Sequence, residues 1–187
     1  MRILFISDLH LGDGSNADDF GKNDDKFIKW INSLDFDLGY LVGDVYELWQ
    51  FKMKRIKKAH PKLINMFEKW KYISGNHDYS LMKKDKAIIT TKSGKKILIS
   101  HGHQSDKRMN NPLMRSLVWC LGIVERIPFF SWVDNPDQFV KHQNSADIKT
   151  MDYAKKQLLN GYDVVICGHT HKALIKKFTG DRDWETN

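Results

Sequence analysis

Short, continuous apolar runs recur along the chain, and stretches with helical periodicity separate them. The runs are rich in Ile, Val, Leu and aromatic residues and lie at 2–7, 38–43, 70–75, 96–100 and 164–168. Continuous runs of this length are typical of strands buried on both faces. "AIITT" is joined to the run at 96–100 by "KSGKK", which predicts a hairpin that turns at Ser93 and Gly94. We therefore expect a mixed β-sheet.

Two of the intervening stretches have the spacing of amphipathic helices. "DDKFIKWINSL" and "KLINMFEKW" each place four apolar side chains on one face: Phe27, Ile28, Ile31 and Leu34 in the first, and Leu63, Ile64, Phe67 and Trp70 in the second. The alternation of strand and helix predicts an α/β layered fold.

The segment from about 104 to 160 departs from this alternation. It is strongly apolar, with Leu113, Leu117, Leu121 and Val124 at helical spacing, then Pro128 and the aromatic residues Phe129, Phe130 and Trp132. A second helical pattern leads back to the run at 164 and contains Ile148, Met151, Ala154 and Leu158. At 187 residues, the chain is predicted to form a single domain, 1–187, with a helical insertion at about 104–160.

Composition sets broad limits on location and partners. No apolar segment approaches the ~20 residues of a membrane span, and the first residues lack the pattern of a secretory signal, so we expect a cytoplasmic protein. The net charge of +7 and the pI near 9.3 favour anionic partners, namely phosphate groups, nucleic acid or acidic lipid. Lysine-rich "FKMKRIKKAHPK" is typical of a solvated helix face. Cys120 and Cys167 lie in apolar stretches and are predicted to be buried thiols.

Polar side chains follow each apolar run. They are Asp8 and His10, Asp44, then Asn76, His77 and Asp78, then His101 and His103, and finally His169 and His171. The carboxyl ends of strands line the ligand crevice of open α/β sheets, so these groups should converge. An i, i+2 spacing in extended backbone would direct Asp8 and His10 to one face, and likewise His169 and His171.

This set of donors predicts a pair of divalent metal ions. Carboxylate, imidazole and amide ligands without a thiolate suit Mn²⁺, Fe or Zn²⁺, with Mn²⁺ preferred here, and disfavour a structural zinc site. Two adjacent metals can activate a hydroxide and hold a phosphoryl oxygen during in-line displacement. One carboxylate should bridge the two ions, and Asp44 is the natural candidate.

Five motifs follow one another between residue 4 and about residue 178: DxH, GD, GNHD, (S)HGH and GHTH. In this order they resemble the motifs of the calcineurin-like metallophosphoesterase superfamily. The resemblance implies a layered sandwich of mixed β-sheets flanked by helices. It also implies two sets of metal ligands that share one carboxylate: Asp8, His10, Asp44 and His171 for one ion, and Asp44, Asn76, His101 and His169 for the other.

The same resemblance implies roles for three further residues. His77 would be free of metal, would bind the phosphate and would protonate the leaving oxygen, and Asp78 would orient its ring. His103 would lie behind the ligands or face the substrate.

Within the superfamily, "SDLHLG", "GDVYELW" and the insertion are similar to the UDP-2,3-diacylglucosamine hydrolase branch, which cleaves a pyrophosphate in lipid A synthesis. The insertion would then form a lid over acyl chains, with basic residues meeting the inner membrane face. The apolar lining of that lid would include Leu113, Leu117, Val118, Trp119, Leu121, Phe129, Phe130 and Trp132. Alternatively, these residues pack the insertion onto the sheet.

Two positions depart from this branch, which tends to have Arg in place of His77 and "HGD" in place of "HGH". Two other functions therefore stay open. The positive charge and the lysine runs would also suit a nucleotide or nucleic-acid phosphodiesterase, which is less favoured. A catalytically inactive metal-binding scaffold is the third hypothesis, and it would have no need for His77 beside Asp78.

Overall fold

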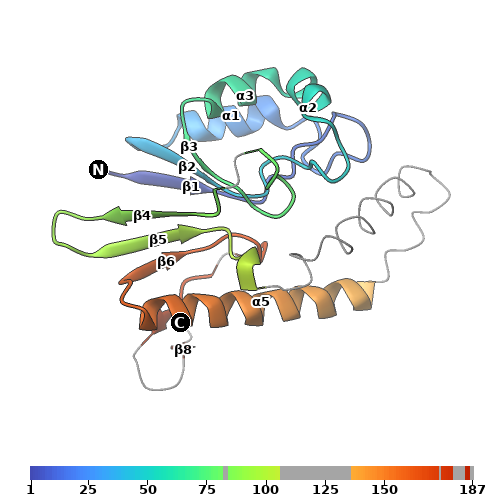
Figure 1. Ribbon diagram of the computed structural model, residues 1–187. Helices are drawn as coiled ribbons and strands as arrows, with labels where there is room; N and C mark the ends of the chain where they lie inside the picture. Colours follow the sequence, from blue (N-terminus) through green and yellow to red (C-terminus); the bar gives the residue numbers. More distant parts are fainter. Residues whose placement is uncertain (82–83, 106–135, 173, 179–183, 186–187) are drawn as a thin grey trace.

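The computed structural model describes residues 1–81, 84–105, 136–172, 174–178 and 184–185, and these form two three-stranded sheets (Figure 1). The first sheet has the order β1 (Ile3–Ile6), β2 (Leu38–Val42), β3 (Lys71–Ile73), all parallel. In the second sheet, β5 (Lys96–Ser100) lies between β4 (Lys86–Thr90), which is antiparallel to it, and β6 (Val164–Ile166), which is parallel. The predicted α/β fold with mixed pairing is confirmed.

The two sheets pack face to face, which explains why the strands read as continuous apolar runs. Val42 of β2, Ile73 of β3 and Ile99 of β5 are buried together in one core cluster. Partly buried residues of β1, β4 and β5 complete this cluster, among them Phe5, Ala87, Ile89 and Ile97. Strands of the first sheet therefore direct some side chains into the sandwich and others toward a helical layer, whereas β4 leaves Lys86, Ile88 and Thr90 exposed.

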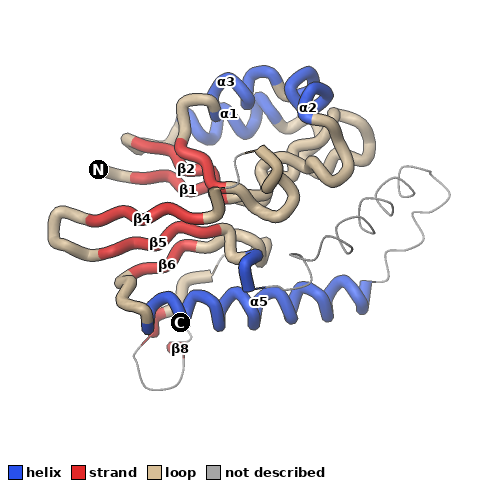
Figure 2. The backbone as a smooth tube through the Cα atoms, viewed as in Figure 1, coloured by secondary structure: helices blue, strands red, loops and turns tan. Residues whose placement is uncertain are grey.

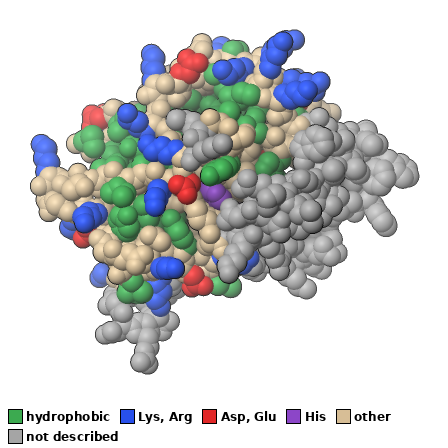
Figure 3. All heavy atoms as spheres, in the orientation of Figure 1, with side chains coloured by type: hydrophobic (Ala, Val, Ile, Leu, Met, Phe, Trp, Pro, Cys, Tyr) green, Lys and Arg blue, Asp and Glu red, His purple; other side chains and the backbone are tan. Residues whose placement is uncertain are grey.

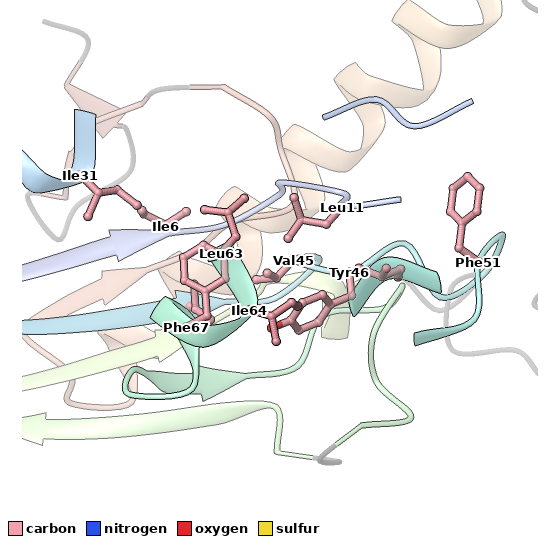
Figure 4. Packing of buried hydrophobic residues seen from close by; sticks show 11 residues of the cluster. Ile6, Leu11, Ile31, Val45, Tyr46, Phe51, Leu63, Ile64 and Phe67 are labelled. Carbon is pink, nitrogen blue, oxygen red and sulfur yellow. The ribbon is translucent and has the colours of Figure 1, made fainter. Parts of the chain in front are cut away.

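Three helices cover the outer face of the first sheet: α1 (Asp24–Asn32), α2 (Met53–Ala59) and α3 (Pro61–Phe67) (Figures 1 and 2). Leu63 and Phe67 of α3 lie beside Ile6 of β1, in a core cluster that also contains Ile31 of α1 (Figure 4). Gly39 of β2 leaves room for an indole, because a Cβ there would lie 2.1 Å from the Trp70 ring.

The long helix α5 (Pro136–Leu159) runs along the second sheet (Figure 1). Its Thr150 is buried, and its Tyr153 hydroxyl donates to Ser100 Oγ of β5 at 3.2 Å. The short 3₁₀ helix η1 (His103–Ser105) follows β5. Near the end of the chain, β7 (Lys177–Phe178) pairs antiparallel with β8 (Trp184–Glu185).

Several smaller predictions can be compared with the structure. The hairpin between β4 and β5 is confirmed, with Gly94 at a φ of 82° and its N–H donating to Thr91 O. Cys167 is a free cysteine that is half-buried rather than fully buried, and burial raises the pKa of its thiol to about 12. Cys120 and the predicted lid residues Leu113 to Trp132, including Trp119, Phe129 and Phe130, lie outside the described residues.

On the face shown in Figure 3, Lys and Arg side chains are dispersed, with acidic side chains among them. In the described part of the chain, no helix combines the length and the apolar character needed to cross a bilayer.

Candidate metal centre

The loops after five strands meet at one end of the sandwich, and backbone hydrogen bonds join them. The Asp8 N–H donates to Gly43 O at 3.1 Å, and the His10 N–H donates to Asp44 O at 3.0 Å, so the loops after β1 and β2 are paired. The His169 N–H lies 3.0 Å from both carboxylate oxygens of Asp8, which brings the loop after β6 to the loop after β1. Residues at opposite ends of the chain are thus neighbours, as the sequence predicted.

The backbone at this end of the sandwich is unusual. Every described non-glycine residue with positive φ is a predicted metal ligand: Asp8 (56°), His10 (47°), Asp44 (50°), His169 (73°) and His171 (52°). Such left-handed conformations cost free energy in L-residues and are concentrated at functional sites, where the surrounding structure enforces them. The expectation of extended backbone at Asp8, His10, His169 and His171 was therefore wrong, although the donors of Asp8 and His10 do lie close together.

The predicted ligand atoms gather into two groups, each within 4.8 Å, and a third such group joins His10 to Glu47 and His77. Asp8, His10 and His171 form the first group, with His171 Nε2 3.5 Å from Asp8 Oδ1. Asp44, His101 and His169 form the second, with His101 Nε2 3.0 Å from Asp44 Oδ2. The groups are adjacent, because His101 Nε2 is also 3.9 Å from Asp8 Oδ1.

Hydrogen bonds behind the site set the orientation of two imidazoles. His101 Nδ1 donates to the Val42 carbonyl at 2.8 Å, and His10 Nδ1 lies 2.9 Å from Glu47 Oε2. A ring that donates through Nδ1 offers the lone pair of Nε2 to a ligand, which is the usual arrangement around metal-bound histidine. Both rings are therefore oriented to present Nε2.

Two buried polar atoms without partners in the described ranges also fit the binding of divalent ions. His10 Nε2 and Asn76 Oδ1 are buried, yet neither has a hydrogen-bond partner among the described residues. Buried polar atoms without partners are costly, and a cation would satisfy both. Oxygen and imidazole donors with no thiolate also match the metals that the sequence suggested.

The charges in this site stabilise one another. Burial alone would raise the pKa of Asp44, but the neighbouring imidazoles of His101 and His77 hold it well below its usual range. Conversely, burial would lower the pKa of His101, and the carboxylates of Asp44 and Asp8 raise it to about 9. A concentration of carboxylate charge that draws in cations is what a divalent metal site requires.

Two glycines allow the loops to approach so closely. A Cβ at Gly75 would lie 2.1 Å from Asp44 Oδ1, and one at Gly168 would lie 2.7 Å from Asp8 Oδ2. A side chain at either position would displace a carboxylate of the site, so both glycines are needed for the packing of the loops.

His77 lies beside both groups, and its partner is not the predicted one. The His77 N–H donates to Asp44 Oδ1 at 2.8 Å, and Nε2 of the ring lies 4.0 Å from Asp44 Oδ2. Nδ1 of the ring lies 2.6 Å from Glu47 Oε2. The prediction that Asp78 orients this ring is therefore corrected: Glu47 occupies that position.

Asp78 instead links two loops through their backbones. Its Oδ1 accepts from the Gly75 N–H at 2.7 Å, and its Oδ2 accepts from the N–H groups of Val45 at 2.8 Å and Tyr46 at 3.3 Å. The side chain is fully buried, and burial together with the charge of Asp44 raises its pKa. Asp78 thus positions the loops after β2 and β3 and makes its contacts there with main chain.

Glu47 is the site residue that the sequence reasoning missed. It lies in "GDVYELW", in which Asp44 is the one residue predicted to belong to the site. Its carboxylate is buried and contacts both His10 and His77; burial alone would raise its pKa, but these two histidines lower it to about 2. A buried acid three residues after a predicted ligand is the signal that could have identified it.

His103 lies behind the ligands, as one of its two predicted positions requires. It is buried, with its ring centroid 5.5 Å from that of His101 and 6.2 Å from that of Tyr79. Burial and the nearby His101 lower the pKa of His103 to about 4, so the ring is neutral at physiological pH.

The family assignment agrees with this geometry. The family model described as calcineurin-like phosphoesterase matches residues 1–173. The chain belongs to this family, and it is a metal-dependent phosphoesterase whose site takes divalent metal ions.

Curated relatives indicate which members of the family are similar. The chain is 26% identical to UDP-2,3-diacylglucosamine hydrolase from Vibrio atlanticus (strain LGP32), over 100% of this chain and 87% of the relative. It is 25% identical to the protein of the same name from Blochmanniella pennsylvanica (strain BPEN), over 95% of this chain and 82% of the relative. A third, from Haemophilus influenzae (strain PittGG), is 23% identical over 98% of this chain and 90% of the relative.

One solved structure is of a protein from Streptococcus pneumoniae TIGR4 that is described as a conserved uncharacterized protein and predicted phosphoesterase. It has a TM-score of 0.33 and 17% sequence identity to this chain. The match covers 64% of this chain and 55% of that chain. The assignment of the fold rests on the family match and on the sheet topology.

Proposed function

We propose that the protein uses two divalent ions, preferably Mn²⁺, to hydrolyse a phosphoester or pyrophosphate bond in a substrate like UDP-2,3-diacylglucosamine. The observation that carries the proposal is the pair of adjacent donor groups, one around Asp8 and one around Asp44. His10 and His171 would complete the first metal site, and Asn76, His101 and His169 the second, with Asp44 between them. When bound, the two cations neutralise phosphoryl charge and lower the pKa of a water molecule.

His77 would act on the leaving group. Glu47 at Nδ1 leaves Nε2 as the nitrogen that can face a substrate, and Nε2 is 4.0 Å from the carboxylate proposed to bridge the metals. His77 donates its Nε2 proton to the leaving oxygen, and the carboxylate of Glu47 stabilises the ring while it is charged. The correction from Asp78 to Glu47 changes the partner of His77 and keeps its role.

A small groove beside the second donor group could receive one part of a lipid-linked phosphate. It has a volume of about 130 Å³, and Gly168 and Thr170, which flank His169, lie in its wall. The rest of the lining combines apolar side chains with two cations, and it includes Met151, Ala154, Leu174, Lys172 and Lys176. Apolar walls with a few charged groups are typical of sites for amphiphilic ligands, and the names of the three relatives support the same substrate class. We propose that such a substrate is taken from the inner face of a membrane.

A substrate panel tests this function. Protein loaded with Mn²⁺ would be assayed on a UDP-linked diacyl sugar, single-stranded DNA, a cyclic nucleotide and an aryl phosphodiester. We expect turnover of the diacyl sugar, and turnover of nucleic acid alone would establish the phosphodiesterase alternative instead. No hydrolysis of any substrate, with two equivalents of metal bound, would establish the scaffold.

The variant His77→Ala tests the proton donor. It should retain both metals and lower kcat by ~10² to 10⁴, the range for general acid catalysis. Lys62→Ala, at an exposed ion pair with Asp25, is the matched control and should retain full activity. Loss of metal from His77→Ala would show that this ring is a ligand.

A further inference from the structure

Trp49 lies directly against His77. Its indole ring stacks on the imidazole with 3.7 Å between ring centroids and 21° between ring planes. The indole N–H also donates to the backbone carbonyl of Asn76 at 3.0 Å. One side chain therefore contacts the proposed proton donor and the peptide that joins it to a proposed metal ligand.

The environment of His77 shows what this contact adds. Glu47 lies at Nδ1, and the His10 ring meets the imidazole edge-on with centroids 4.6 Å apart. The backbone N–H of His77 is held by Asp44. Glu47 and Asp44 thus restrain one ring nitrogen and the main chain, and the indole stacks nearly parallel on the ring itself.

A purely structural role explains Trp49 less well. Trp49 is half-buried, and in the described part of the chain it belongs to neither hydrophobic core cluster. It lies in the turn after Tyr46, which forms an isolated bridge with Leu11. It stacks on His77 and donates to Asn76 O, and both of these residues lie in the site.

We propose that Trp49 is a positioning residue that holds His77 in the orientation needed for proton transfer to the leaving group. This inference rests on the proposed function. The indole face prevents the imidazole from rotating away from the site, and the hydrogen bond to Asn76 O holds the peptide on which the ring is carried. Such control matters because a misplacement of about 1 Å can cost ~10² in rate.

Three variants test the proposal. Trp49→Leu removes both the stacking and the hydrogen bond, whereas Trp49→Phe keeps a ring and removes only the N–H donor. Trp30→Leu is the control, because it changes a tryptophan on α1 that is 47% exposed. Each would be loaded with Mn²⁺ and compared for metal content, orthophosphate affinity, kcat and KM on aryl phosphodiesters that differ in leaving-group acidity.

Trp49→Leu should bind the same amount of Mn²⁺ and lose ~10²-fold in kcat on the poorest leaving group. The loss should shrink as the leaving group becomes more acidic, because a good leaving group needs less protonation. Trp49→Phe should fall between Trp49→Leu and the wild type. Added to His77→Ala, the change Trp49→Leu should have almost no further effect, since the group it positions is gone.

The proposal would be overturned if Trp49→Leu lowered kcat equally on all leaving groups, or if its effect on kcat added fully to that of His77→Ala. Trp49 would then be a packing residue. Loss of metal from Trp49→Leu would do the same. If the wild type hydrolysed neither the UDP-linked diacyl sugar nor any phosphodiester, the proposed function would fail, and orthophosphate binding would decide about Trp49. Trp49→Leu must then weaken that binding as much as His77→Ala does, and unchanged affinity would rule out positioning.

Discussion

Glu47 Oε2 lies 2.6 Å from Nδ1 of His77, in the position that had been expected for Asp78. We predict that Glu47→Gln lowers kcat by ~10- to 100-fold, a part of the contribution of general acid catalysis, because an amide cannot stabilise a charged imidazole. Steady-state kinetics on a poor leaving group would measure the loss, and Glu68→Gln, at an exposed acid on the surface, is the control. Unchanged kcat in Glu47→Gln would show that the contact has no role in proton transfer.

Asp78 should behave differently, because its carboxylate holds main chain. Asp78→Ala leaves the buried N–H groups of Gly75, Val45 and Tyr46 without their acceptor. Each unsatisfied buried donor costs about 1–3 kcal/mol, so the free energy of unfolding should fall by about 3 kcal/mol or more. Urea denaturation in EDTA would measure this, and a change below about 1 kcal/mol would contradict the assigned role.

Asp44 belongs to the second donor group and is proposed to lie between the two metals, so its loss should affect both metals. Asp44→Asn should reduce the bound Mn²⁺ from two equivalents to less than one, measured by elemental analysis after dialysis, whereas Asp25→Asn, at an exposed acid on α1, should retain both. Loss of a single equivalent from Asp44→Asn would mean that this carboxylate serves one ion only.

Removal of the metals should lower thermal stability. A ligand present at 100 times its Kd stabilises the folded state by about 2.7 kcal/mol, which corresponds to a Tm shift of about 5–10 °C for a chain of this size. Calorimetry of the protein in EDTA and after restoration of Mn²⁺ would measure the shift. An identical Tm in both conditions would contradict metal binding at this site, and Asp44→Asn should show the smaller shift.

A buried histidine far from the metal centre predicts a pH dependence of stability. His60 Nδ1 lies 2.6 Å from Asp24 Oδ1 and Nε2 lies 2.9 Å from Asp18 Oδ2. Burial alone would lower the pKa of His60, but its hydrogen bonds to Asp24 and Asp18 raise it above the usual value. Protonated His60 therefore stabilises the fold fully below the unfolded pKa of about 6.5, and this contribution is lost as the pH rises through the raised pKa of the folded state.

His60→Gln should consequently lower the free energy of unfolding by about 2 kcal/mol at pH 6, the scale of hydrogen bonds to charged groups, and by less at pH 9. Burial alone would raise the pKa of Asp18, but His60 and nearby backbone N–H groups lower it, so Asp18 stays ionised at both pH values. Denaturation in EDTA would measure both differences, with Lys62→Ala as a surface control. A difference that is equal at pH 6 and pH 9 would contradict the charged state of His60.

The sequence by itself determined the strands, the hairpin and the positions of the candidate ligands. Apolar runs report burial directly, since a strand between two layers needs apolar side chains on both faces. A polar side chain after such a run lies where strands end, so Asp8, Asp44, Asn76, His101 and His169 could be assigned to one cleft without coordinates.

Only the tertiary structure decided how these side chains are directed and what supports them. At Asp8 and His10 the backbone is left-handed rather than extended as the spacing predicted, and their donors nevertheless lie in one group. The family resemblance implied Asp78 as the partner of His77, but at a turn the direction of the Cβ decides which acid reaches a ring. That acid is Glu47 from the loop after β2, and Trp49 comes from the same loop. The packing of one loop against another sets such contacts, and no local sequence pattern indicates that packing.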